Sequence, residues 1–110
     1  MSKFLVAALI ITLILFGNNI VFASTEKDFL IYMNDWESKR EIASKYLKEA
    51  KIAFKEGDEL TGCATQRKAS KFGIKATKSL IKAMELNGSY EGLDNLEAGL
   101  NKWRELGDFC

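Results

Sequence analysis

The segment AFKEGDEL, residues 53–60, contains a helix stop followed at once by a helix start. Gly57 suits the left-handed backbone that ends many helices, because glycine has no β-carbon to clash there. Asp58 comes next, and its side-chain oxygen can accept from the first free N–H groups of a following helix. A connection this short predicts two antiparallel helices, one on each side of it.

The residues before this turn predict one long helix, from about Glu26 to Glu56. Apolar residues recur there at helical spacing, and no stretch of the chain alternates long enough to indicate a strand. The predicted apolar stripe consists of Phe29, Tyr32, Met33, Trp36, Ala43, Tyr46, Leu47, Ala50, Ala53 and Phe54.

Two further helices are expected after the turn, the first from about Glu59 to Leu86. Asn87-Gly88 then breaks the pattern, and Ser89 is expected to cap a third helix that ends at Gly107. Gly92 and Gly99 fall inside this third helix, where each either weakens it or lets a neighbour approach closely. Its apolar stripe consists of Tyr90, Leu93, Leu96, Leu100, Trp103 and Leu106.

Small residues cluster on both sides of the first turn, at Ala50, Ala53, Gly62 and Ala69. Over about 20 residues this pattern resembles the middle of a tetratricopeptide hairpin, in which small residues lie where two helices cross. No repeat of the 34-residue period exists in the chain, so we interpret the pattern as generic antiparallel helix packing.

The predicted fold is therefore all-α: a small antiparallel three-helix bundle, made of a long helical hairpin and a shorter third helix. Cys63 and Cys110 test this topology, since a third helix folded back on the second brings them within reach of each other. We expect them to form one disulfide that staples the bundle. Two free thiols, or a bridge between two chains through the terminal Cys110, are the alternatives.

The N-terminus resembles a secretory signal peptide. Met1-Ser2-Lys3 forms a short basic region, and an apolar run follows from Phe4 to Phe16. Val21 and Ala23 occupy the −3 and −1 positions of a cleavage site before Ser24. We expect residues 1–23 to be removed, leaving residues 24–110 as a single helical domain that is secreted or periplasmic, with no stable membrane insertion after cleavage. The alternative is an uncleaved anchor.

Composition excludes several chemistries. The chain has no His, which rules out Ser-His and Cys-His catalysis and His-ligated metals. Ser79 and Lys82 match the S-x-x-K of Ser/Lys acyl-transfer enzymes, but the companion motifs are missing. We expect no metal, no cofactor and no catalytic activity. Removing residues 1–23 takes away one Lys and leaves 15 basic and 15 acidic side chains, so a nucleic-acid partner is not expected.

Charge is nevertheless concentrated on the second helix. Six cations there follow a spacing of three and four residues, which places them within about a 100° arc of the helix surface. These residues are the candidate binding face: Arg67, Lys68, Lys71, Lys75, Lys78 and Lys82. Alternatively they form a solvated face that Glu91, Asp94 and Glu97 of the third helix partly neutralise.

The sequence favours a small exported binding protein of the inhibitor, immunity or periplasmic adaptor type, whose partner is another protein. The alternative is a polyanion- or surface-binding protein that uses the basic stripe of the second helix.

Overall fold

The computed structural model describes residues 12–110, with side chains from Thr25 onward. It contains helices α1 (Thr12–Lys55), α2 (Glu59–Leu86) and α3 (Leu93–Asp108). Residues 1–11, which hold the basic region and half of the apolar run of the expected signal peptide, lie outside the described residues. Helix α1 continues N-terminally past the start expected at Glu26. Among these helices, as far as they are described, none combines the length and apolarity that crossing a membrane requires.

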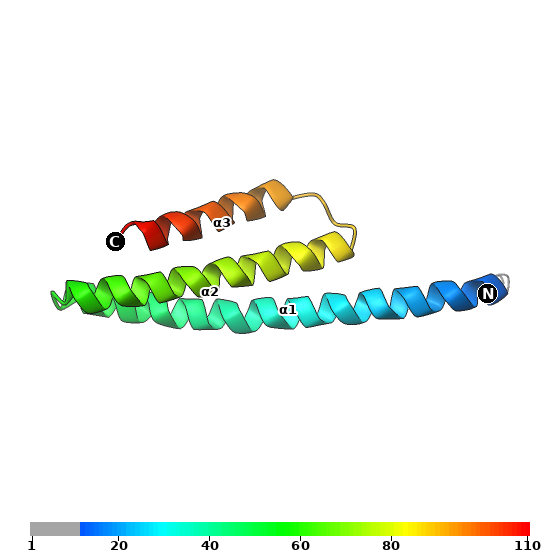
Figure 1. The fold of residues 1–110 in the computed structure, drawn as a ribbon, viewed down its shortest axis with the longest axis horizontal. Helices are drawn as coiled ribbons and strands as arrows, with labels where there is room; N and C mark the ends of the chain where they lie inside the picture. The colour runs from blue at the N-terminus through cyan, green and yellow to red at the C-terminus, as the bar shows by residue number, and fades with distance from the viewer. Residues whose placement is uncertain (1–11) are drawn as a thin grey trace.

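The three helices run antiparallel in chain order, with α2 in the middle (Figure 1). Helix α2 packs against α1 and against α3, whereas no Cα atom of α3 lies within 8 Å of one in α1 over the described residues. The predicted class, a long helical hairpin with a shorter third helix, is confirmed. The helices meet along two seams, and α2 contributes to both.

Helices α1 and α2 end in the same way, through a glycine with a left-handed backbone. Gly57 has a φ of 82° and Gly88 a φ of 72°. After each glycine the next N–H turns back into the helix, Asp58 N donating to Ala53 O and Ser89 N to Met84 O. This is the Schellman arrangement, which satisfies carbonyls that the helix end would otherwise leave free. The stop signals at both glycines are confirmed.

The cap expected at the start of α2 is also present. The Asp58 carboxylate accepts from the backbone N–H of Thr61 at 3.1 Å. Hydrogen bonds from the side chain and the backbone of Thr61 lower the pKa of Asp58. The turn between α1 and α2 therefore follows the local sequence closely, because glycine closes one helix and the adjacent aspartate opens the next.

The expected start of the third helix was wrong. Ser89 does not cap α3, because its backbone N–H closes the end of α2. Helix α3 begins at Leu93, after Gly92 in a left-handed conformation with a φ of 88°. Tyr90 consequently lies in the turn, where it is 66% exposed, and takes no part in the apolar stripe of α3.

The seam between α1 and α2 is lined by small residues at intervals of seven. On α2 these are Gly62, Ala69, Ala76 and Ala83, and all four are buried. They face the alanines Ala43, Ala50 and Ala53 of α1, each at most 6% exposed. A seven-residue repeat keeps one face of a helix turned to its partner, and small side chains permit a close approach. The predicted crossing of the hairpin on small residues is confirmed.

The seam between α2 and α3 is shorter and centres on one glycine. The indole of Trp103 packs on Gly73 so closely that a β-carbon at this position would lie 2.1 Å from the ring. Ser70 Oγ donates to the Trp103 carbonyl at 2.6 Å beside this contact. Gly73, like Gly62 and Gly107, therefore admits a side chain of a neighbouring helix, whereas no atom of another segment lies within 4 Å around Gly99.

Candidate docking face

The six cations of the predicted face all lie exposed on α2. Arg67 and Lys82 mark the two ends of the row, which is about 22 Å long at the helical rise of 1.5 Å per residue. Residues that contact α1 and α3 occupy the rest of the circumference of α2, so the row projects from the side that neither neighbour covers. We call this surface the basic face.

Two members of the basic face also contact aromatic rings. Lys68 Nζ lies 5.7 Å from the ring centre of Tyr46, and Lys75 Nζ lies 5.7 Å from that of Phe72. These two rings stack across the seam between α1 and α2, with centres 5.9 Å apart. A cation over an aromatic ring is stabilised by the negative potential of that ring's face. Lys68 and Lys75 therefore have a structural role in addition to their charge.

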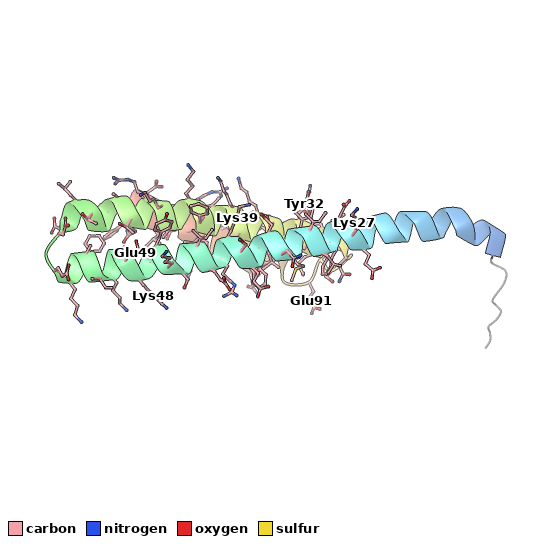
Figure 2. All side chains as sticks on the ribbon, turned by 90° about the horizontal axis from the view of Figure 1, so that it is seen from below. Lys27, Tyr32, Lys39, Lys48, Glu49 and Glu91 are labelled. Atoms are coloured by element: carbon pink, nitrogen blue, oxygen red, sulfur yellow. A yellow bond between two sulfur atoms is a disulfide. The ribbon has the colours of Figure 1, made fainter. Side chains whose placement is uncertain are left out.

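The acidic residues expected to neutralise the basic face make no ion pair with it. Within residues 25–110, the single pair with nitrogen and oxygen at most 4.0 Å apart joins Lys39 to Asp35. Figure 2 shows Glu91 on the lower side of the molecule in that view, and it lies exposed in the turn between α2 and α3. Asp94 and Glu97 belong to the exposed surface of α3. Direct pairing with these carboxylates therefore does not account for the six cations.

One cation beside the basic face was not found from the sequence. Arg104 of α3 lines a shallow hollow together with Arg67 and Lys71 of α2, and Asp108 borders the same hollow. Ser70 of α2 donates to the Trp103 carbonyl of α3, so the α2–α3 seam brings the next residue, Arg104, near Arg67 and Lys71. No local sequence pattern joins residues so far apart in the chain. Arg104 can be found only by first pairing α2 with α3 and then counting the charges along both helices.

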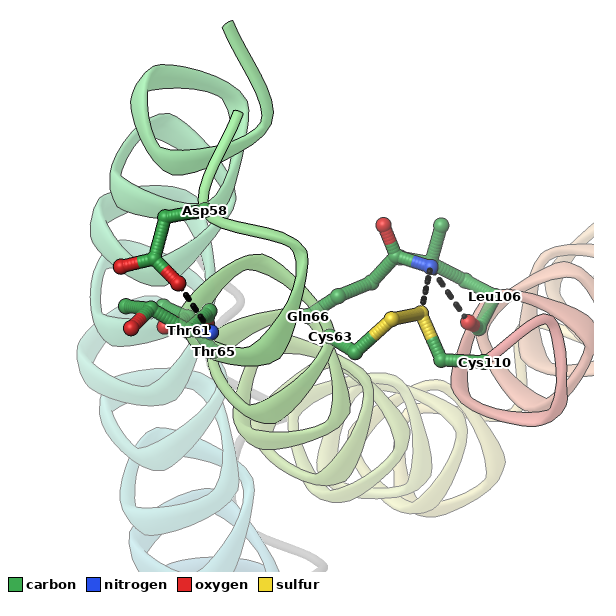
Figure 3. The surroundings of a disulfide bond; sticks show 7 residues. All are labelled: Asp58, Thr61, Cys63, Thr65, Gln66, Leu106 and Cys110. Carbon is green, nitrogen blue, oxygen red and sulfur yellow. Dashed lines mark hydrogen bonds between the residues drawn. A yellow bond between two sulfur atoms is a disulfide. The ribbon is translucent and has the colours of Figure 1, made fainter. Parts of the chain in front are cut away.

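The predicted disulfide is present. Cys63 and Cys110 are joined with their Cα atoms 5.5 Å apart, a common separation for such a bond. Gln66, one turn after Cys63, donates through Nε2 to the Leu106 carbonyl at 2.9 Å and to Cys110 Sγ at 3.8 Å (Figure 3). These contacts tie the C-terminal turn of α3 to the first half of α2. Both cysteines are consumed within one chain.

A polar cluster crosses the seam between α1 and α2. The Ser79 hydroxyl donates to the Asp35 carboxylate, whose other oxygen accepts from Lys39. Figure 2 shows Lys39 along this seam. The hydrogen bonds from Lys39 and then Ser79 lower the pKa of Asp35. The hydroxyl of Ser79 is therefore bonded to a carboxylate, while Lys82 of the S-x-x-K match lies exposed on the basic face.

Residues 25–110 contain no group of three or more His, Cys, Asp or Glu side chains placed to hold a metal ion. No protein-family model, curated protein or solved structure matches this chain.

Proposed function

We propose that the protein is an exported binding protein that docks an acidic partner protein on the basic face of α2. The observation that carries the proposal is the row of six exposed cations, none of which has a carboxylate within 4.0 Å among the described residues. Like charges held along one rigid helix raise the local positive potential. An acidic surface is attracted to that potential and oriented by it.

Export is supported by the disulfide and by the extent of helix pairing. Disulfides persist in oxidising compartments such as the periplasm and the cell exterior. Thr25 and Phe29 of α1 lie beside Leu86, the last residue of α2. Removal of residues 1–23 would leave this paired part of α1 intact. The intact mass of the exported protein tests the cleavage: a chain beginning at Ser24 is expected, and retention of Met1 to Ala23 contradicts it.

The docking proposal is tested by reversing charge on the basic face. Lys71, Lys78 and Lys82 are the suitable targets, because they make no ring contact like those of Lys68 and Lys75. Changing all three to Glu should abolish capture of the partner from native extract while leaving the helical signal unchanged. Exposed ion pairs contribute only about 0–1 kcal/mol to folding, so stability should change little.

A matched control changes Lys27, Lys45 and Lys55 to Glu. These lysines are exposed on α1, and the change in net charge is the same. The control should capture the partner as the wild type does. Equal loss in both triple variants would show an effect of net charge alone and contradict docking on the basic face.

The neutralisation hypothesis makes the opposite forecast. If the row balances Glu91, Asp94 and Glu97, the triple change on α2 should lower the melting temperature and leave capture unaffected. Reversal of those three acids to Lys should then restore the melting temperature. Retention on an immobilised polyanion that falls with salt, without capture of any protein, would favour the polyanion-binding function instead.

A further inference from the structure

Helices α1 and α3 share α2 as a neighbour but do not pack on each other. An apolar hollow lies on the α1–α2 side of the angle between them. Leu47 and Phe54 line it from α1, and Gln66 lines it from α2. Leu106 and Phe109 line a second hollow, on α3. Gln66 connects the two parts, because its side chain donates to the Leu106 carbonyl. We call this surface the corner groove.

The apolar side chains of the corner groove are only partly covered, and Phe109 is the most exposed of them. Leu47, Phe54 and Leu106 are only half-buried, and Phe109 is 82% exposed. An aromatic ring that stays this exposed forgoes the favourable burial that large apolar side chains normally gain. The groove therefore presents unsatisfied apolar surface two helical turns long on α1, from Leu47 to Phe54.

The floor of the corner groove holds the side chain of Gln66, which can accept as well as donate hydrogen bonds. Gln66 is 9% exposed, and its Nε2 donates a hydrogen bond to the Leu106 carbonyl. No group within residues 25–110 donates to its Oε1, which Figure 3 shows directed away from Leu106. Because Gln66 lines the hollow, this oxygen is placed to accept a hydrogen bond from a bound molecule.

The rim of the corner groove is positively charged. Lys48 and Lys51 border it on α1, and Lys102 borders it on α3. Glu105 is the one carboxylate among the lining residues of the two hollows. An occupant with an apolar stripe and acidic flanks would match both the floor and the rim.

We infer that the corner groove binds an amphipathic helix with acidic flanks, supplied by a partner protein. Such a helix would lie between α1 and α3 and turn the open corner into a four-helix arrangement. This site does not rest on the basic face, which projects from the side of α2 away from both neighbours. The protein would then be two-sided, able to hold one partner on each side of α2.

The probe is a fluorescein-labelled peptide of about five helical turns, with Leu at positions i, i+3, i+4 and i+7 and Glu elsewhere. It is titrated into the exported protein and followed by fluorescence anisotropy. We expect saturable binding at a ratio of one to one. A peptide of the same composition in scrambled order should bind at least about tenfold more weakly. Equal binding of the two peptides overturns the inference.

Variants locate the bound peptide. The double change Phe109→Asp and Lys51→Glu affects exposed side chains, so the fold should persist, which circular dichroism checks. It should weaken binding at least about tenfold. The matched control Lys45→Glu and the basic-face triple Lys71→Glu, Lys78→Glu and Lys82→Glu should bind as the wild type does.

Two outcomes overturn the inference without touching the proposed function. Binding lost only in the basic-face triple places the peptide on α2. A wild-type dimer in sedimentation that the change Phe109→Asp dissociates makes a second copy the occupant. Conversely, peptide binding that survives the basic-face triple supports the corner groove even if the acidic partner of α2 is never captured.

Discussion

The two seams of the molecule are held together by different means. Between α1 and α2, contact is spread over several helical turns of alanine and glycine, and it includes the Phe54 ring on Gly62 and the stack of Tyr46 on Phe72. Between α2 and α3, it is concentrated in one indole on one glycine, two side-chain hydrogen bonds to carbonyls and one disulfide. A spread seam tolerates the loss of any single contact better than a concentrated one. Single changes should therefore affect the α2–α3 seam more strongly.

The largest expected effect comes from the disulfide. Changing Cys63 and Cys110 to Ser opens a cross-link that spans 47 residues. In the chain-entropy model this lowers the free energy of unfolding by about 4 kcal/mol. Urea unfolding followed by circular dichroism should show the loss, and wild-type protein treated with a thiol reductant should match the variant. A loss below about 1 kcal/mol would mean that the other contacts of α3 suffice without the bond.

Gly73→Ala should have the next largest effect. The new β-carbon would lie 2.1 Å from the Trp103 ring, so the indole must move. Overpacking of this kind costs about 1–3 kcal/mol, despite the better helix propensity of alanine. Gly99→Ala is the matched control, because it is a helical glycine with open space around it. It should raise stability by up to about 1 kcal/mol. Similar thermal shifts in the two variants would contradict close packing at Gly73.

A smaller effect is expected from the polar cluster on the spread seam. Ser79→Ala removes the hydroxyl that donates to Asp35 and should cost about 1 kcal/mol. The pKa of Asp35 is lowered in the folded protein, so its stabilisation is present above the unfolded pKa and is lost as pH falls through the folded pKa. The difference in melting temperature between wild type and Asp35→Asn should therefore shrink below about pH 4.

The smallest effect is expected at the turn between α1 and α2. Asp58→Ala removes the acceptor for the Thr61 N–H and should lower the melting temperature slightly. The pKa of Asp58 is also lowered, so its contribution too is lost as pH falls. Asp58→Asn retains a capping oxygen and should keep most of the stability at neutral pH. If the two substitutions had the same effect at neutral pH, the charge and not the cap would be responsible.

Much of the spread seam could be predicted from the sequence, because its signals are local. Gly57 and Asp58 specify a turn by their own conformational preferences, and the alanines repeat at a spacing that any helix preserves. The cysteine pair then set the direction of α3. Antiparallel pairing followed without knowledge of any single long-range contact.

The concentrated seam was harder to predict because its contacts join distant residues. Gly73 in the middle of a helix has no distinguishing local pattern, and its importance depends on Trp103 lying opposite. Ser89 illustrates the same problem at α3. A serine after a glycine suits a helix start, but here its N–H closes the previous helix and Gly92 moves the start to Leu93. Apolar periodicity predicts which face of a helix is buried, but it does not predict which other helix covers that face. The corner groove was therefore not predicted.

The position of the disulfide also determines how the molecule would respond to a protease. The turn between α2 and α3 is exposed at Asn87, Gly88, Tyr90, Glu91 and Gly92, which makes it one natural place for a nick. A cut there separates α3 from α2 along the chain, yet the bond from Cys63 to Cys110 keeps the C-terminal fragment attached. The nicked protein would migrate as one species without reductant and as two with it. Cleavage would therefore leave both fragments covalently linked until a reducing environment separates them.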